Sequence, residues 1–245
     1  MEVETRSTKV RTDAGDMTVH VARPRGEAGK LPVILVIMEA FGLNDHIKDV
    51  TNRFAREGYH AVAPDVYYRQ GGKIVGYDKL QEAIGMLTAL KDDEVVADLK
   101  SVITSLKSDP GVRADRIGIT GFCMGGRISY LAACEIPEIR AAVPWYGGSI
   151  AGQQMQPGAT APVERTGKMK ASILLHFGEK DSFIPLSAVE EIRTALQKEK
   201  RDFELHVYEG ADHGFYCDER PSYHPEAAKL AWDRTRRFFE KHLKG

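Results

Sequence analysis

Cys123 lies in a segment whose spacing suits nucleophilic chemistry. The apolar run 117–122 predicts a strand, residues 121–125 have the pattern Gly-x-Cys-x-Gly, and a helical pattern opens directly after Cys123. This order is typical of a nucleophile elbow with sulfur in place of the usual serine oxygen, in which glycines remove side chains that would collide where strand and helix cross. A helix N-terminus also favours the thiolate. The alternative is an inert buried cysteine beside a turn that merely needs glycine.

Two later residues supply an acid and a base in a matching order. Asp181 and His213 each follow an apolar run that predicts a strand. The chain order nucleophile, acid, histidine is that of a hydrolase triad on an α/β sheet. Asp212, which is adjacent to His213, is an alternative acid, but a carboxylate that fixes the tautomer of the ring has to approach from a neighbouring strand end. His176 also lies near a strand end, inside an apolar run, where a core histidine is the favoured interpretation.

An oxyanion formed at Cys123 would need two N–H donors. The residue after the nucleophile, Met124, supplies one backbone N–H, and the loop after the apolar run 32–38 supplies the other, which nominates Ala40. Glu39 precedes Ala40 at the end of that apolar run. A buried acid is costly unless it has a partner or a task, so Glu39 is either functional or a solvent-facing residue at the edge of the sheet.

These residues depend on the elements that position them. Apolar runs predict strands at 3–10, 17–23, 32–38, 59–63, 116–122, 141–146, 172–177 and 203–208. Helical patterns span 46–57, 78–90, 93–106, 187–198 and 225–243, and a further helix begins at Met124. The first two strands predict an antiparallel pair, and the alternation that follows predicts a mostly parallel, doubly wound sheet with helices on both faces. The predicted class is α/β, with the α/β-hydrolase fold.

The length of 245 residues suits one α/β domain, residues 1–245, around a single large core. The segment 147–168 is rich in Gly, Gln, Pro and Thr, which predicts a long loop. Long loops at strand ends are often functional. This one is either a lid over the site or a surface excursion.

Composition narrows the classes of partner. The formal net charge is -1, so no strong field exists to recruit nucleic acid or an anionic membrane surface. No apolar run is long enough for a membrane span, and residues 1–10 lack the apolar centre of a secretory signal, which predicts a cytoplasmic protein. The three cysteines are too few and too far apart for a disulfide framework, and no spacing predicts a zinc site.

The chain resembles the dienelactone hydrolases, also called carboxymethylenebutenolidases, over nearly its whole length. Six segments carry the resemblance: 39–44 (EAFGLN), 63–67 (APDVY), 121–126 (GFCMGG), 145–148 (WYGG), 178–185 (GEKDSFIP) and 213–215 (HGF). The cysteine elbow together with the Glu-x-Phe-Gly loop is fairly specific, and each is weaker alone.

The resemblance implies a triad of Cys123, His213 and Asp181. It also implies that Glu39 contacts the nucleophile in the resting enzyme and helps to deprotonate it when substrate binds. Further members of the site that it implies are pocket-lining aromatic residues: Phe41, Tyr146 and Phe183. Such enzymes need no metal or organic cofactor, act on small-molecule esters or lactones, and are expected as monomers or homodimers.

Two departures from the family concern the binding of a substrate carboxylate. Family members that hydrolyse dienelactone place an arginine shortly after the histidine, and Cys217 stands at that position. Arg220, three residues further on, is a candidate to reach the same pocket. A second arginine is expected after Tyr67, where only Arg69 is available. Because guanidinium pairs with carboxylates bidentately, loss of these groups would weaken the binding of anionic substrates.

The predicted function is hydrolysis of an ester or lactone through a thioester on Cys123. The alternative within enzymes is a general carboxylesterase or thioesterase that acts on neutral esters. A remote alternative is a non-catalytic α/β-hydrolase-fold protein that binds a ligand. The order of nucleophile, acid and base argues against it, because a binding protein needs no such order.

Overall fold

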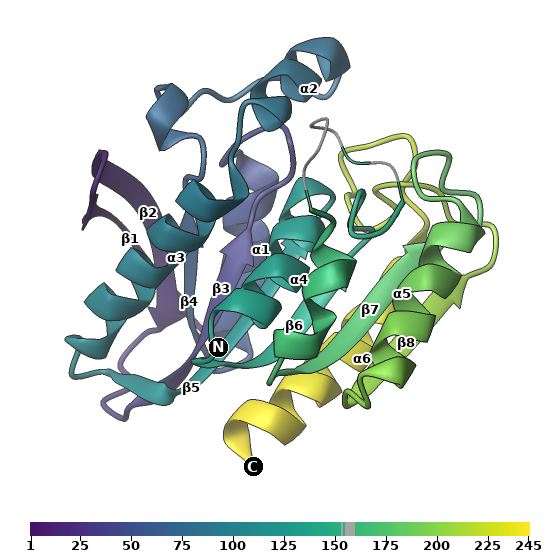
Figure 1. The fold of residues 1–245 in the computed structure, drawn as a ribbon. Coiled ribbons are helices and arrows are strands. Elements are labelled where there is room, and N and C mark those ends of the chain that lie inside the picture. The colour runs from purple at the N-terminus through teal and green to yellow at the C-terminus, as the bar shows by residue number, and fades with distance from the viewer. Residues whose placement is uncertain (153, 155–159) are drawn as a thin grey trace.

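A computed structural model of the chain describes residues 1–152, 154 and 160–245. An eight-stranded sheet runs through the molecule in the order β1-β2-β4-β3-β5-β6-β7-β8 (Figure 1). The first two strands are antiparallel to each other, β2 is antiparallel to β4, and the remaining pairs are parallel. The strands are β1 Val3–Thr12, β2 Gly15–Pro24, β3 Leu31–Ile37, β4 His60–Pro64, β5 Val112–Phe122, β6 Ile139–Trp145, β7 Ser172–Gly178 and β8 Phe203–Tyr208.

Helices cover both faces of the sheet. Figure 1 shows α3, α4 and α5 in front of the strands, with α1 and α6 behind them. The helices are α1 Asp45–Arg56, α2 Leu80–Thr88, α3 Asp92–Lys107, α4 Met124–Glu135, α5 Leu186–Lys198 and α6 Pro225–Phe239. Shorter helical turns are η1 Tyr68–Gln70, η2 Pro162–Lys168 and η3 Glu240–Lys244. The predicted α/β class, the mostly parallel doubly wound sheet and the antiparallel start are confirmed.

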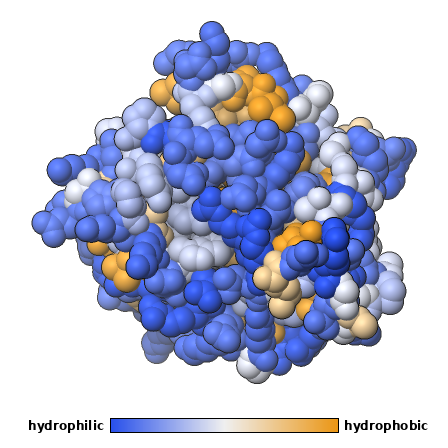
Figure 2. All heavy atoms as spheres, turned by 180° about the vertical axis from the view of Figure 1, so that it is seen from behind, coloured by the Kyte–Doolittle hydropathy of each residue, from blue (hydrophilic) through white to orange (hydrophobic). Residues whose placement is uncertain are grey.

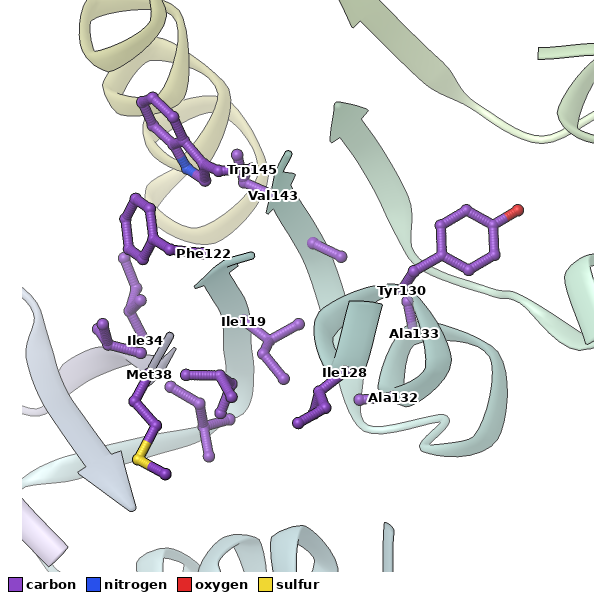
Figure 3. Packing of buried hydrophobic residues seen from close by; sticks show 14 of the residues in the cluster. Ile34, Met38, Ile119, Phe122, Ile128, Tyr130, Ala132, Ala133, Val143 and Trp145 are labelled. Carbon is purple, nitrogen blue, oxygen red and sulfur yellow. The ribbon is translucent and has the colours of Figure 1, made fainter. Parts of the chain in front are cut away.

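The core forms because the central strands are buried on both faces. Every residue of β3 is buried, as a continuous apolar run in a helix-covered sheet requires. Residues of β5 point to opposite faces: Ile119 points toward α4 and Ile128, whereas Phe122 points toward α6, as does Trp145 of the neighbouring strand β6 (Figure 3). The two aromatic rings are 5.4 Å apart between centroids.

Element boundaries differ from the prediction in a few places. The strand β5 begins at Val112 rather than at 116, because its first residues pair with Leu31 and Pro32 of β3. The last helix changes at Glu240 into a π-helical turn, which the apolar period alone does not distinguish from α-helix. In the predicted loop 147–168, the final seven residues form η2. The question of a lid falls partly on residues 153 and 155–159, outside the described residues.

None of the helices in the described part of the chain combines the length and apolar character that crossing a bilayer requires.

Candidate active site

The carboxyl ends of the parallel strands bring the predicted residues to one edge of the sheet. Cys123 follows β5, Asp181 follows β7 by three residues, and His213 follows β8 by five. Glu39 lies two residues after the end of β3. Ligands of open α/β sheets bind outside this edge, so the fold positions these side chains where a small molecule can reach them.

The turn at Cys123 has the strained backbone of an elbow. Its φ is 55° and its ψ is -115°, a conformation that L-residues rarely adopt. Gly121 and Gly125 make the turn possible, since a Cβ at Gly121 would overlap the carbonyl of Gly125, and a Cβ at Gly125 would overlap the carbonyl of Ile37. Cys123 is partly exposed, whereas Cys134 and Cys217 are buried. The turn therefore presents Cys123 at the surface of the site.

The structure brings Asp181 and His213 into contact. Asp181 Oδ2 lies 2.8 Å from Nδ1 of His213, and both side chains are buried. The other carboxylate oxygen accepts hydrogen bonds from the backbone N–H groups of Phe183 at 2.9 Å and Ile184 at 3.1 Å. Asp181 therefore both orients the ring and caps its own turn. Asp212, the alternative acid, is exposed and accepts a hydrogen bond from the backbone N–H of His213 at 2.6 Å.

His213 also lies beside Cys123, since both residues line the same cavity and the charge of Cys123 acts on the ring. Burial of the ring lowers its pKa, but the neighbouring negative charge on Cys123 and the hydrogen bond with Asp181 outweigh burial. Together they raise the pKa of His213 to about 10. The site thus favours a protonated ring beside Cys123 at neutral pH.

A cavity of about 400 Å³ opens in front of Cys123. Its lining residues are Ala40, Phe41, Leu80, Ile84, Leu87, Thr88, Cys123, Met124, Gly148, Ser149, Phe183, His213 and Arg220. The volume is in the range of small-molecule sites, and most of the lining is apolar. In the described part of the chain, no group of three or more His, Cys, Asp or Glu residues is arranged to hold a metal ion.

The two predicted oxyanion donors lie in this lining. Met124 is the first residue of α4, so its N–H has no acceptor within the helix. Tyr67, which the sequence analysis did not nominate, is fully buried, and its hydroxyl lies 3.0 Å from the carbonyl oxygen of Ala40 and 3.2 Å from Sδ of Met124. It therefore contacts both residues. The signal in the sequence was its place in segment 63–67, one of those that carry the family resemblance, but this does not reveal the contact.

Glu39 is paired with Arg220. Its side chain is fully buried, so a solvent-facing position is excluded, and Oε1 lies 3.4 Å from Nη1 of Arg220. Its other oxygen has no hydrogen-bond partner among the described residues. The arginine reaches this depth because Gly214 has no side chain: a Cβ there would overlap the guanidinium. The hydrogen bond of Glu39 in the described residues is thus to Arg220. Its contact with the nucleophile, which the resemblance implies, stays a prediction.

A model of the "Dienelactone hydrolase family" matches residues 17–243. The chain belongs to the dienelactone hydrolase family. Membership makes it a carboxylic ester hydrolase of the α/β-hydrolase superfamily, as the sequence predicts.

Relatives and solved structures agree with this family. A Synechocystis sp. protein named "Putative carboxymethylenebutenolidase" is 40% identical over 222 residues, which cover 88% of each chain. An Escherichia coli protein of the same name is 37% identical over 96% of this chain and 86% of its own. The crystal structure of a "Putative Dienelactone Hydrolase" from Klebsiella pneumoniae has 36% identity and a TM-score of 0.90, and covers 98% of this chain and all of that chain.

Arg69, the second candidate for binding a substrate carboxylate in this dienelactone hydrolase family member, lies away from the cavity. Arg69 does not line the cavity, because its guanidinium is bound to Asp98 at 2.8 and 3.0 Å and to Asp13 at 2.6 Å. An arginine held by two carboxylates has few donors left for a ligand. Of the two candidates, the structure brings only Arg220 to the site.

Four other family positions differ in how they take part. Tyr146 is fully buried and packs edge-on against His213 at 5.2 Å between ring centroids, so it supports the ring and does not line the cavity. Phe41 and Phe183 do line it. Cys217, in place of the family arginine, is buried and donates to the Tyr77 hydroxyl at 3.2 Å. Burial raises the pKa of this thiol to about 12, so it is inert.

Proposed function

We propose that this ester or lactone hydrolase uses Cys123 as its nucleophile and forms a thioester on it. The observation that carries the proposal is the contact of Cys123 with His213, which is itself held by Asp181 at 2.8 Å. A thiolate on a strained turn, beside a protonated ring and at the wall of a cavity, has what an attacking group needs. The other two cysteines are buried, and neither lines the cavity.

In the first half of the reaction, the thiolate attacks the ester carbonyl carbon. Negative charge moves to the carbonyl oxygen, which accepts hydrogen bonds from the N–H groups of Met124 and Ala40. The C–O bond then breaks, and the leaving oxygen takes the proton from Nε2 of His213. The products of this half are an alcohol, neutral His213 and the thioester; in a lactone the alcohol stays attached to the acyl group.

Water completes the reaction. Neutral His213 takes a proton from water while the hydroxide attacks the thioester carbon, and the C–S bond breaks to release the thiolate. Asp181 keeps Nδ1 protonated, so Nε2 is the atom that exchanges protons with substrate and water. The acid product loses its proton to solvent, and the ion pair of thiolate and imidazolium is restored.

Arg220 is the proposed anchor for a substrate carboxylate. Its hydrogen bond to Glu39 is long, at 3.4 Å, and engages one of its five N–H donors. A substrate carboxylate can therefore bind the same guanidinium. Glu39 then keeps its own hydrogen bond to Arg220 and holds the guanidinium in place. If the carboxylate displaces Glu39, the freed acid becomes a proton acceptor near the nucleophile.

Steady-state hydrolysis of cis-dienelactone and p-nitrophenyl acetate tests the proposal. Wild type, Cys123→Ala and the matched control Cys134→Ala are compared. We expect Cys123→Ala to lose at least 10³-fold in kcat, and Cys134→Ala to retain activity, because that thiol is buried with a pKa raised to about 12. Full activity in Cys123→Ala would contradict the proposal.

The same experiment separates the substrate classes. Turnover of both esters that depends on Cys123 supports a dienelactone hydrolase, with Arg220→Met then raising KM for the anionic substrate alone. Turnover of p-nitrophenyl acetate alone supports a carboxylesterase for neutral esters. No turnover of either would favour a ligand-binding protein.

A further inference from the structure

Helix α2 forms one wall of the cavity with apolar side chains. Leu80, Ile84 and Leu87 line it, and their spacing of four and three residues places them on one face of the helix. The neighbouring face carries Ala83 and Met86, which are buried and attach α2 to the body of the protein. The helix thus has one apolar face for the core and a second for the cavity.

Part of this wall is exposed to solvent. Leu80 is 39% exposed, whereas Ile84 and Leu87 are half-buried. Phe183, which belongs to the same cavity lining, is 58% exposed. Figure 1 shows α2 beyond the carboxyl ends of the strands, apart from the two helical layers. Figure 2 shows a mostly hydrophilic surface on which hydrophobic side chains gather near the top of the molecule, the end where α2 lies. Apolar surface that faces a reacting group is a binding surface for apolar parts of a ligand.

The wall is held beside the site by one backbone and one side-chain hydrogen bond. The N–H of Val75 donates to the carbonyl of Phe41 at 3.0 Å, which joins the segment before α2 to the loop that carries Ala40. Asn44 donates to the hydroxyl of Tyr77 at 3.0 Å. The position of α2 is therefore set from the same loop that supplies the proposed oxyanion donor.

We propose that α2 forms an apolar subsite in which Leu80, Ile84 and Leu87 receive an aliphatic or aromatic group of the substrate. The inference rests on the proposed function, because it places this group next to the ester that Cys123 attacks. The substrate class is then an ester or lactone that carries a medium-length apolar substituent. A carboxylate, where the substrate has one, binds Arg220 in the same cavity.

A series of p-nitrophenyl esters tests the subsite. The acyl chain is lengthened from acetate to butyrate and hexanoate, and kcat/KM is measured for wild type, Ile84→Asn, Leu87→Asn and the control Gln81→Asn. Gln81 is on the exposed side of α2 and does not line the cavity. Melting temperatures show whether each variant is folded.

In wild type we expect kcat/KM to rise two- to fourfold per methylene, the upper figure corresponding to full burial at about 0.8 kcal/mol. In Ile84→Asn and Leu87→Asn the ratio of hexanoate to acetate should fall at least fivefold, and in Gln81→Asn it should match wild type. The ratio is the readout, so a general loss of rate in a variant does not affect the conclusion.

Binding of butyrate, hexanoate and octanoate, measured by calorimetry, gives a second readout that needs no catalysis. Affinity that increases with chain length in wild type and not in Ile84→Asn supports the subsite even if no ester is hydrolysed. Independence of chain length in both measurements, or an equal dependence in wild type and the two α2 variants, would overturn it. Failure of the proposed function shows separately, as ester hydrolysis that persists in Cys123→Ala.

Discussion

At the scale of single residues, the protonation of His213 decides how the proposed nucleophile is activated. Desolvation opposes the charge on the ring, whereas Cys123 and Asp181 favour it, and the pKa of His213 is raised to about 10. A raised pKa means that the protonated ring stabilises the folded protein. That contribution is complete below the ordinary value of 6.5 and is lost as the pH rises through about 10.

Replacement of Asp181 by Asn should lower the pKa of His213. The substitution removes the carboxylate charge that stabilises the imidazolium. Because the ring is then no longer held in one tautomer, kcat should fall by about 10²-fold or more. Titration of the His213 ring by NMR measures the shift. Asp212→Asn is the matched control, since Asp212 contacts only the backbone N–H of His213. Equal titration curves in both variants would show that Asp181 does not act on the ring.

Tyr67→Phe should reduce both activity and stability. The change removes the hydroxyl that contacts Ala40 and Met124, so an oxyanion donor loses its support, and kcat should fall about tenfold. The buried carbonyl left without a donor should cost about 1 to 3 kcal/mol of unfolding free energy. The control is Tyr130→Phe, which loses a hydroxyl bonded to Thr166 away from the site. Tyr130→Phe should lose stability but keep its kcat. Urea unfolding measures the stability, and steady-state kinetics measure kcat.

At the scale of elements, the elbow works because β5 and α4 approach one another without side chains between them. The nearest atoms to a Cβ on Gly125 are carbonyl oxygens of β3 and the residue after it, which cannot move without breaking the sheet. The strain at Cys123 is therefore maintained by the surrounding strands.

Glycine substitutions in two elements should have opposite effects. Gly125→Ala should destabilise the protein by about 3 kcal/mol or more and abolish activity, because the new methyl group overlaps backbone. Gly85→Ala in α2 should leave it folded and more stable by up to about 1 kcal/mol, since nothing lies within 4 Å of the new Cβ and alanine favours the helix. Urea midpoints measure both. A stable, active Gly125→Ala protein would contradict the steric account of the elbow.

At the scale of the whole molecule, a buried carboxylate connects the N-terminal strand pair to the helical layer. Asp98 on α3 accepts hydrogen bonds from Arg69 and, at 2.7 Å, from the hydroxyl of Tyr68. Tyr68 in turn lies 2.7 Å from the hydroxyl of Thr12, the last residue of β1. The network ties the antiparallel edge of the sheet to α3.

Asp98→Ala should destabilise the protein by about 2 to 3 kcal/mol while kcat stays at the wild-type value. Removal of Asp98 takes two hydrogen bonds from the Arg69 guanidinium, which keeps only its bond to the exposed Asp13, and neither Asp98 nor Arg69 lines the cavity. The control Arg11→Ala breaks the exposed pair with Asp16, and its unfolding free energy should hardly change. If Asp98→Ala instead raised KM for an anionic substrate with stability unaltered, Arg69 would belong to the substrate site after all.

Much of the architecture followed from local patterns in the sequence. The apolar runs of β3 and β7 are long enough to show that both faces of the strand are covered, and their alternation with helices predicts parallel order. The glycines around Cys123 mark the elbow because the crossing of strand and helix leaves no room for a Cβ at either position. The candidates Asp181 and His213 followed from their place after strands, since parallel strands end at one edge.

What the sequence determined by itself was the set of strand ends and the chemistry attached to each of them. Only the tertiary structure decided which side chains meet. The partner of Glu39, the remoteness of Arg69, the contact of Tyr67 with Ala40 and the apolar wall of α2 depend on contacts between segments distant in the chain. Periodicity records which face of an element is buried, but it does not record which side chain from another element covers that face. Packing determines these contacts, because a neighbouring side chain must fit the space left where a Cβ is absent and must pair with any charge that is buried.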